Sequence, residues 1–299
     1  MERVDETTLN LFQLHLTKRI IEALRLQNAN PKYTPSACHL TASPNSEPRE
    51  EEWSYRSLVG MLQFLANNTR PDIAYAVNQV ARYCNNPRKI HEVAVKHIAR
   101  YLKASLYDDN GTERVRGTYY RIDKKKPLQL DLYADADFAG GWNVKEQEDP
   151  DTARSRTGYL VMLNDTPIVW ASRVQTEIAL STAEAEYAAL SSGMRALVPT
   201  RHLLFEVAER MKIDASRISL ISKAYEDNQA ALHIATSDPP KLTARNKHWN
   251  IKHHWFRSHL SPDGIQVKPI STTEQLADIF TKSLPRVTFE KFRLEIMGW

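Results

Sequence analysis

The apolar residues of this chain change their spacing near Pro127, and this change limits the possible folds more than any other feature. Before Pro127, Leu, Ile and Val residues recur at helical intervals in the segments 55–66, 73–84 and 91–102. After it, Leu128, Leu130 and Leu132 alternate with polar residues, as in a strand with one buried face. The chain therefore joins a helical region to a region that contains a sheet.

The second region alternates strand patterns with helical ones. Further strand patterns cover 158–163, 168–172, 218–225 and 265–270. A long helix is predicted from Ser181 to Met211, with Pro199 expected to kink or break it. Another helix starts at Asn228, and a last one opens at Thr272, where Gln275 can complete a capping box. This order predicts a mixed α/β sheet layered with helices.

The composition is that of an ordinary globular protein, with 42% hydrophobic and 25% charged residues in 299 positions. The net charge of +4 is too small to indicate nucleic-acid binding by itself. Cys38 and Cys84 have no metal-type spacing and fit a reducing interior. The N-terminus has no apolar signal segment, and no run is long enough to span a membrane. We therefore expect an intracellular, soluble protein.

Four acidic residues stand at the edges of predicted elements in the second region: Asp135, Glu186, Asp227 and Asp278. Carboxylates gathered from distant segments can hold two divalent cations about 3.5–4 Å apart, an arrangement that hydrolyses phosphodiesters. A single acidic residue at a strand end is more often an ordinary helix cap. Spacing alone does not separate these two interpretations, although four such residues in this element order favour the metal site.

Two neighbouring acidic residues compete with the quartet. Ser181 followed by Glu184 forms a capping-box pattern at the start of the long helix, so Glu184 is an alternative to Glu186. Asp137 shares a strand face with Asp135.

The segments around these acids have distinctive sequences. In chain order they are YADADFAG (133–140), SRTGY (155–159), IVWAS (168–172), ALSTAEAEYAAL (179–190), EDNQAA (226–231) and EQLADIFTK (274–282). Together they resemble the ribonuclease H domain of copia-type LTR retrotransposon Pol polyproteins. The resemblance covers essentially the whole domain.

The resemblance implies a five-stranded mixed sheet flanked by helices and a D-E-D-D site made of Asp135, Glu186, Asp227 and Asp278. Within that motif Glu186 is favoured over Glu184, which is left to the helix cap. Asp137 is an alternative auxiliary ligand, although we expect it to support the ligands and not to bind the metal. The implied cofactor is Mg²⁺, with Mn²⁺ as an alternative. The implied reaction is endonucleolytic hydrolysis of the RNA strand of an RNA–DNA hybrid, which is distinguished from DNA by its 2′-hydroxyl groups.

The first region resembles the part of these polymerases between the palm and the ribonuclease H domain. Its motifs are YRSLVGMLQFLA (55–66), TRPDIAYAVN (69–78) and HIARYLK (97–103). The implied divisions are a palm and linker fragment (1–52), a helical thumb or connection-like region (53–126), the ribonuclease H-like domain (127–284) and a tail helix (285–299). The implied partner is the rest of the Pol polyprotein, in the cytoplasm or in a virus-like particle.

A basic segment precedes the last predicted strand. We expect its side chains to contact the hybrid backbone together with a later lysine; they are Arg245, Lys247, His248, Lys252, Arg257 and Lys282. A solvated basic helix explains the same segment equally well. The histidines between 248 and 259 do not follow a zinc-site spacing and have no cysteine nearby.

Polymerase activity is not predicted for this chain. Tyr107-Asp108-Asp109 lacks the residue that separates Tyr from the Asp pair in the polymerase motif, and it leads into a turn at Asn110-Gly111. Two functions therefore stand at this stage. One is a metal-dependent ribonuclease H, and the alternative is a truncated, non-catalytic Pol remnant that folds and binds nucleic acid.

Overall fold

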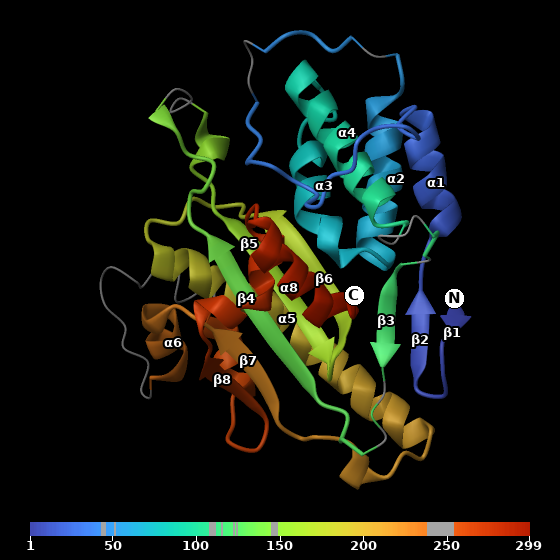
Figure 1. Cartoon of the computed structure of the whole chain (residues 1–299). Coiled ribbons are helices and arrows are strands. Elements are labelled where there is room, and N and C mark those ends of the chain that lie inside the picture. Colours follow the sequence, from blue (N-terminus) through green and yellow to red (C-terminus); the bar gives the residue numbers. More distant parts are fainter. Residues whose placement is uncertain are drawn as a thin grey trace. The chain divides into compact units, whose positions relative to one another are not determined.

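The computed structural model describes residues 1–42, 46–50, 52–107, 112–114, 116–121, 123, 125–144, 149–237 and 254–299. These residues form two compact units (Figure 1). The first unit contains 1–120 and 282–299, and the second contains 121–281. The four-part division expected from the sequence stays a prediction.

The first unit is mainly helical. Its helices are α1 (Leu14–Ala23), α2 (Tyr55–Asn68), η1 (Pro71–Ile73), α3 (Ala74–Ala81), α4 (Lys89–Ala104) and α8 (Arg286–Met297). Its strands are β1 (Glu2–Arg3), β2 (Thr8–Leu11) and β3 (Thr118–Arg121), which pair in that order. The three helical patterns of the sequence therefore correspond to α2, α3 with η1, and α4.

The first unit contains a buried network of hydrogen-bonded polar side chains. Arg70 and Asp72 are each 2% exposed and form a two-pronged ion pair with N–O distances of 2.8 and 2.9 Å. Asp72 also accepts a 2.6 Å hydrogen bond from Tyr101 on α4, and Arg70 donates to Ser105. Buried charges require such pairing because their transfer from water is costly.

The second unit contains the sheet predicted from the sequence. Its strands are β4 (Leu130–Asp137), β5 (Arg156–Leu163), β6 (Thr166–Val174), β7 (Ser222–Glu226) and β8 (Ile265–Pro269). Its helices are η3 (Pro150–Thr152), α5 (Thr182–Arg210), η4 (Ala215–Arg217), α6 (Gln229–Thr236), η5 (His254–His259), η6 (Thr272–Glu274) and η7 (Leu276–Phe280).

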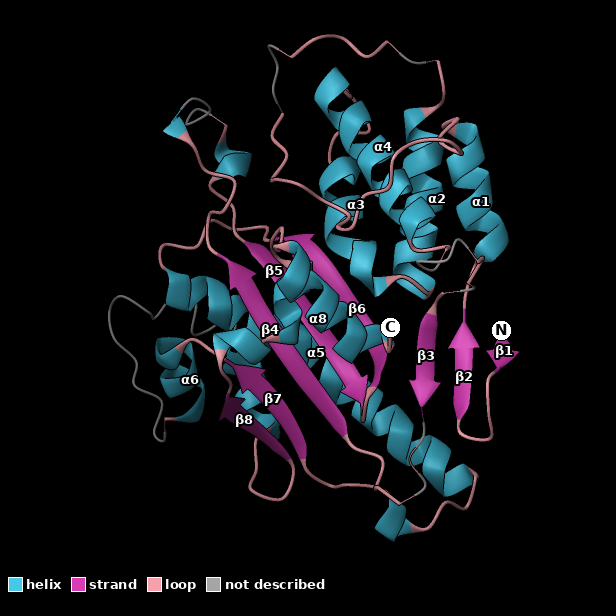
Figure 2. Cartoon of the chain, in the orientation of Figure 1, coloured by secondary structure: helices cyan, strands magenta, loops and turns pink. Residues whose placement is uncertain are grey.

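The five strands are ordered β6-β5-β4-β7-β8 (Figure 2). β4, β5 and β6 form antiparallel pairs, whereas β4 with β7 and β7 with β8 are parallel. This arrangement confirms the mixed five-stranded sheet with helices that the sequence predicts. It also brings the C-terminal ends of β4 and β7 together in the middle of the sheet.

Helix α5 covers one face of this sheet. Leu132, Ala134 and Tyr159 of the sheet share a buried core with α5 residues such as Tyr187 and Leu190. The helix continues through Pro199, so of the kink or break that was expected there the break is wrong. Burial of the apolar face of α5 against the sheet offsets the roughly 3 kcal/mol that an interior proline costs.

The segment after β8 also differs from the prediction. Instead of one helix that opens at Thr272, it forms the short 3₁₀ turns η6 and η7. The capping box does not form, because the Gln275 side-chain oxygen that it would use accepts from the Ala277 amide at the start of η7. The NH2 group of the buried Gln275 side chain donates to the Ala134 carbonyl on β4 at 2.9 Å.

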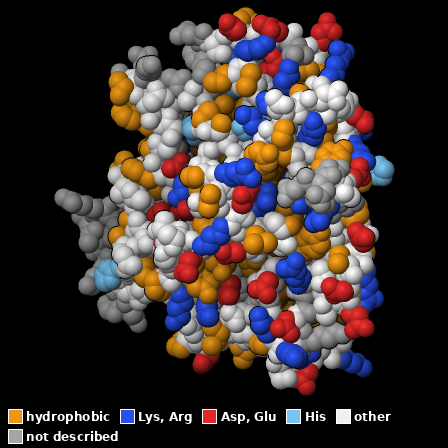
Figure 3. All heavy atoms as spheres, viewed as in Figure 1, with side chains coloured by type: hydrophobic (Ala, Val, Ile, Leu, Met, Phe, Trp, Pro, Cys, Tyr) orange, Lys and Arg blue, Asp and Glu red, His pale blue; other side chains and the backbone are white. Residues whose placement is uncertain are grey.

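The face shown in Figure 3 carries lysine and arginine side chains interspersed with acidic ones. This mixture agrees with the nearly balanced counts of 40 basic and 36 acidic residues. Within the described part of the chain, no helix is both long and apolar enough to cross a membrane.

Candidate metal centre

Asp135 lies near the C-terminal end of β4 and is 2% exposed. Leu132 and Ala134 belong to the core that contains α5. Because successive side chains along a strand point to opposite faces of the sheet, the Asp135 side chain points to the face opposite α5. On that face its carboxylate accepts a hydrogen bond from the hydroxyl of Thr281, which follows η7.

Gly158 allows η7 to approach this part of the sheet. It pairs with Asp135 across β4 and β5, and an added Cβ would lie 2.7 Å from Thr281 Cγ2 and 2.9 Å from the Ala277 carbonyl oxygen. Any larger residue would therefore push η7 away from the sheet. The absence of a side chain at position 158 explains how the segment that carries Asp278 packs beside Asp135.

Two glutamates near the start of α5 have different surroundings. Glu184 serves the helix cap: its backbone amide donates to Ser181 Oγ at 3.2 Å, and its carboxylate accepts from the Leu180 amide at 2.9 Å. Glu186 is 5% exposed and accepts a 2.7 Å hydrogen bond from the Ala136 amide on β4. The structure thus holds Glu184 at the N-terminus of α5, where Ser181 is the N-cap residue, and directs Glu186 toward β4.

Asp227 follows the last residue of β7. It lies just before α6, whose N-cap residue Asn228 accepts hydrogen bonds from the Ala230 and Ala231 amides at 3.0 Å. One Asp227 oxygen accepts a 2.9 Å hydrogen bond from the Thr272 hydroxyl. The backbone on both sides of Asp227 is therefore tied to regular structure.

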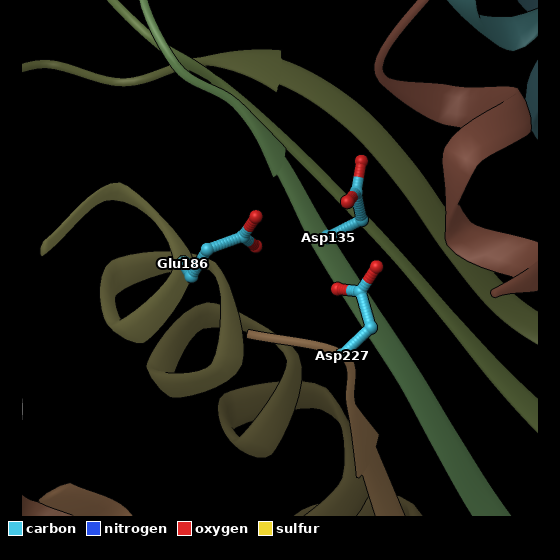
Figure 4. Close-up of side chains that lie close together, drawn as sticks. All are labelled: Asp135, Glu186 and Asp227. Carbon is cyan, nitrogen blue, oxygen red and sulfur yellow. The ribbon is translucent and has the colours of Figure 1, made fainter. Parts of the chain in front are cut away.

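The carboxylates of Asp135, Glu186 and Asp227 converge at one place (Figure 4). One oxygen from each lies within 4.8 Å of the others. They come from β4, α5 and the end of β7, three elements that are far apart in the sequence. All three supply hard oxygen donors, which Mg²⁺ and Mn²⁺ prefer. The residues present therefore fit a divalent cation.

Asp278 is placed nearby but outside this group of three. It lies on η7 and is 5% exposed. The contacts of Thr281 and Gln275 with β4 hold η7 against the strand that carries Asp135. Three of the four acids predicted from the sequence are thus brought together, and the role of Asp278 as the fourth ligand stays a prediction.

The buried acids of the centre repel one another. Burial, reinforced by the nearby carboxylates of Asp135, Glu226 and Asp227, raises the pKa of Glu186 far above its ordinary value. No lysine or arginine among the described residues forms an ion pair with Glu186. Since a buried carboxylate needs a compensating charge, this electrostatic imbalance also favours a bound cation.

Glu226 is a neighbouring acid that the sequence analysis did not select. It is the last residue of β7 and is fully buried. Burial and the nearby Asp227 and Asp135 raise its pKa as well. Its only sequence signal is period-two alternation with Ser222 and Ala224, which are buried on the same strand.

Of the six residues predicted to contact nucleic acid, only Arg257 and Lys282 lie in the described part of the chain. Arg245, Lys247, His248 and Lys252 lie outside the described residues. The Arg257 guanidinium donates to the Ile234 and Ser237 carbonyls at the C-terminal end of α6. Such bonds satisfy carbonyls that a helix end leaves without partners. Lys282 belongs to the first compact unit. Contact of any of these residues with a nucleic acid stays a prediction.

The histidines near the basic segment are also only partly described. His248 and His253 lie outside the described residues. His254 shares a 2.6 Å hydrogen bond with the Tyr187 hydroxyl, so its Nδ1 is engaged within the fold. Nothing in the described surroundings of His254 indicates a metal.

Comparison with known proteins reveals relatives along nearly the whole chain. The chain is 34% identical over 295 residues to the retrovirus-related Pol polyprotein from transposon TNT 1-94 of Nicotiana tabacum, which covers 96% of this chain. It is 34% identical over 289 residues to the corresponding protein from transposon RE1 of Arabidopsis thaliana. The chain belongs to the copia-type retrotransposon Pol polyproteins.

The copia-type Pol relatives are much longer than this chain, which spans 20% of the TNT 1-94 protein and 18% of the RE1 protein. No protein-family model matches the chain. The second unit has the five-stranded mixed sheet that the resemblance implied.

Similar solved structures include ribonuclease H domains. One is the N-terminal ribonuclease H domain of a Mycobacterium tuberculosis protein, with 11% identity, a TM-score of 0.34, and coverage of 55% of this chain and 96% of that one. Another is LC11-RNase H1 in complex with an RNA/DNA hybrid, with 13% identity, a TM-score of 0.35, and coverage of 51% and 94%.

Proposed function

We propose that the second unit is a metal-dependent ribonuclease H that hydrolyses the RNA strand of RNA–DNA hybrids. The observation that carries this proposal is the convergence of Asp135, Glu186 and Asp227 within 4.8 Å at the centre of the sheet. Membership in the copia-type Pol family supports the same activity.

The protein residues would prepare the site before a substrate arrives. Asp135, Glu186 and Asp227 would hold Mg²⁺ or Mn²⁺, with Asp278 as a further ligand. The chemistry that two such cations supply is activation of water and stabilisation of the departing 3′ oxygen. Thr281 would orient Asp135 through its hydrogen bond, and the Ala136 amide would orient Glu186. Groups fixed in this way need little rearrangement when the reaction begins.

The proposed substrate is an RNA–DNA hybrid, and the proposed partner is the reverse transcriptase palm of a longer Pol polyprotein. The compartment would be the cytoplasm or a virus-like particle. The basic residues 245–252, with Arg257 and Lys282, would contact the hybrid backbone. If they do, binding should weaken steeply with salt, because each neutralised phosphate releases counterions.

Cleavage of a labelled hybrid by the full chain tests the function. With Mg²⁺, the protein should cut the RNA strand of the hybrid and leave DNA duplexes intact. Asp227→Asn preserves the shape of the side chain but removes its charge, so it should abolish cutting while hybrid binding survives. Glu184→Gln is the matched control, because it changes an acid of the α5 cap outside the centre.

The outcome also decides between the two functions left open by the sequence. If the unmodified protein is folded but does not cut the hybrid with Mg²⁺ or Mn²⁺, the enzyme proposal is wrong. Hybrid binding without cleavage would then favour the non-catalytic remnant.

A further inference from the structure

Glu226 is a buried acid next to Asp227 that has no role in the four-acid site. Ser222, Ala224 and Glu226 are the buried residues of β7, and Lys223 and Tyr225 between them are partly exposed. Ala224 packs in the core that contains α5 residues, so alternation directs Glu226 toward the face that α5 covers. Glu186 approaches from this same helix.

The centre is therefore built from both faces of the sheet. The Asp135 side chain is on the face of the sheet that η7 covers. Asp227 is one residue beyond Glu226, so the alternation of side chains places Asp227 on that face as well. Glu186 and Glu226 are on the other face of the sheet, which α5 covers. The carboxylates of Asp135, Glu186 and Asp227 converge where β4 and β7 end side by side, and Glu226 is the residue immediately before Asp227.

The Glu226 carboxylate has one satisfied oxygen and one that is not. Oε1 accepts a 3.0 Å hydrogen bond from the Asn228 amide at the start of α6. Oε2 is buried and has no hydrogen-bond partner among the residues that the structure describes. Within the same residues, no lysine or arginine pairs with Glu226. A buried carboxylate in such surroundings is unfavourable unless a cation compensates its charge.

A capping role alone does not explain an acid at this position. The bond from the Asn228 amide needs a single acceptor, and a glutamine side chain would supply one without introducing charge. Instead the position holds a fully buried carboxylate, one residue from Asp227 and on the sheet face from which Glu186 approaches. A buried carboxylate oxygen without a hydrogen-bond partner is the kind of donor that a divalent cation takes as a ligand.

We propose that Glu226 is a fifth carboxylate of the metal centre and that its Oε2 binds a divalent cation together with Glu186. This inference rests on the proposed function, since it assigns a further residue to the same centre. It differs from the four-acid motif, in which the residue before Asp227 has no part.

Mn²⁺ binding to the full chain, measured without substrate by calorimetry and by the loss of the free-ion EPR signal, tests this inference. Glu226→Gln should weaken Mn²⁺ affinity by about 10–100-fold or remove one bound equivalent. Glu184→Gln, which changes an acid on the same helix as Glu186 but outside the centre, should bind as the unmodified protein does. Cleavage by Glu226→Gln should need a correspondingly higher Mg²⁺ concentration, with the KM for the hybrid unchanged.

Thermal melting separates metal binding from a structural role. Without divalent cations, Glu226→Gln should melt at or above the temperature of the unmodified protein, because it removes a buried acid from beside others. Its gain in melting temperature on addition of Mg²⁺ should be smaller. If this variant does not fold, Glu226→Asp retains the charge on a shorter side chain and should show the same weakened Mn²⁺ binding.

The results distinguish this inference from the proposed function. If the unmodified protein binds Mn²⁺ and cuts the hybrid, and Glu226→Gln binds Mn²⁺ equally well, then the inference alone is overturned. If Glu226→Gln loses affinity but the unmodified protein does not cut, the fifth ligand stands and the catalytic proposal fails. If the unmodified protein binds no Mn²⁺, both are overturned.

Discussion

Replacement of Thr281 by valine should disable the centre while preserving its shape. The Thr281 hydroxyl is fully buried and donates to Asp135, and it also lies 3.2 Å from the Asp278 carbonyl oxygen. A hydroxyl has only one proton to donate, and the closer Asp135 carboxylate receives it. Valine keeps the branched outline of threonine and removes this donor, so the Asp135 oxygen loses its partner.

The expected losses of stability and of metal affinity follow from the kind of hydrogen bond that is broken. A hydrogen bond to a charged group contributes about 1.5–3 kcal/mol to stability. For a domain of 150–250 residues, 1 kcal/mol corresponds to roughly 2–4 °C, so the melting temperature should fall by about 3–12 °C. Loss of a group that orients a metal ligand typically costs about 10–100-fold in metal affinity or activity.

The assays are thermal melting, Mn²⁺ binding and hybrid cleavage on Thr281→Val, with Thr281→Ser as the matched control. Serine keeps the hydroxyl and loses only the methyl group that lies close to Gly158. It should therefore restore most of the Mn²⁺ affinity and cleavage, although some packing is lost. Equal Mn²⁺ affinity in Thr281→Val and the unmodified protein, or equal loss in both variants, would refute the orienting role of the hydroxyl.

Two further perturbations test the electrostatics of each unit. The pKa of Glu186 is raised from its ordinary value of 4.5, chiefly by burial, so the folded protein favours the protonated acid. The contribution of Glu186 to metal-free stability should therefore be fully present below about pH 4.5 and be lost as the pH rises. Melting in EDTA between pH 5 and 8 should show this fall and a flatter profile for Glu186→Gln, whereas parallel profiles would contradict it. In the first unit, Asp72→Asn leaves the Arg70 charge buried and should cost about 3–5 kcal/mol in urea unfolding. Glu206→Gln, which breaks an exposed pair with Arg210 on α5 of the second unit, should cost less than about 1 kcal/mol.

Much of the fold could be predicted because its signals are local. The alternation that begins at Leu128 and the pattern from Ser181 to Met211 correspond to β4 and α5. The two errors both arose where tertiary contacts outweigh local preference. Pro199 does not end α5 because the helix is buried on the sheet. Gln275 does not complete a capping box because its side-chain oxygen accepts from Ala277 while its NH2 group is bonded to β4.

The site was predicted less completely than the fold. The motifs selected Asp135, Glu186 and Asp227, which the fold brings together. They did not select Glu226, because an acid at the end of a strand is not distinguished from its neighbours by spacing. Only the burial of the face of β7 that carries Ser222, Ala224 and Glu226 shows that this carboxylate is enclosed.

By itself the sequence determined the order of the elements, the family and the set of acids from which a metal centre could be built. These depend on periodicity and motifs, which are properties of neighbouring residues. The tertiary structure decided which acids meet. Glu184 and Glu186 are two positions apart and point about 200° apart around a helix, so only the docking of α5 on β4 turns one toward the Ala136 amide and leaves the other at the cap. Distances between carboxylates from separate strands and helices are fixed by packing, which no local pattern encodes.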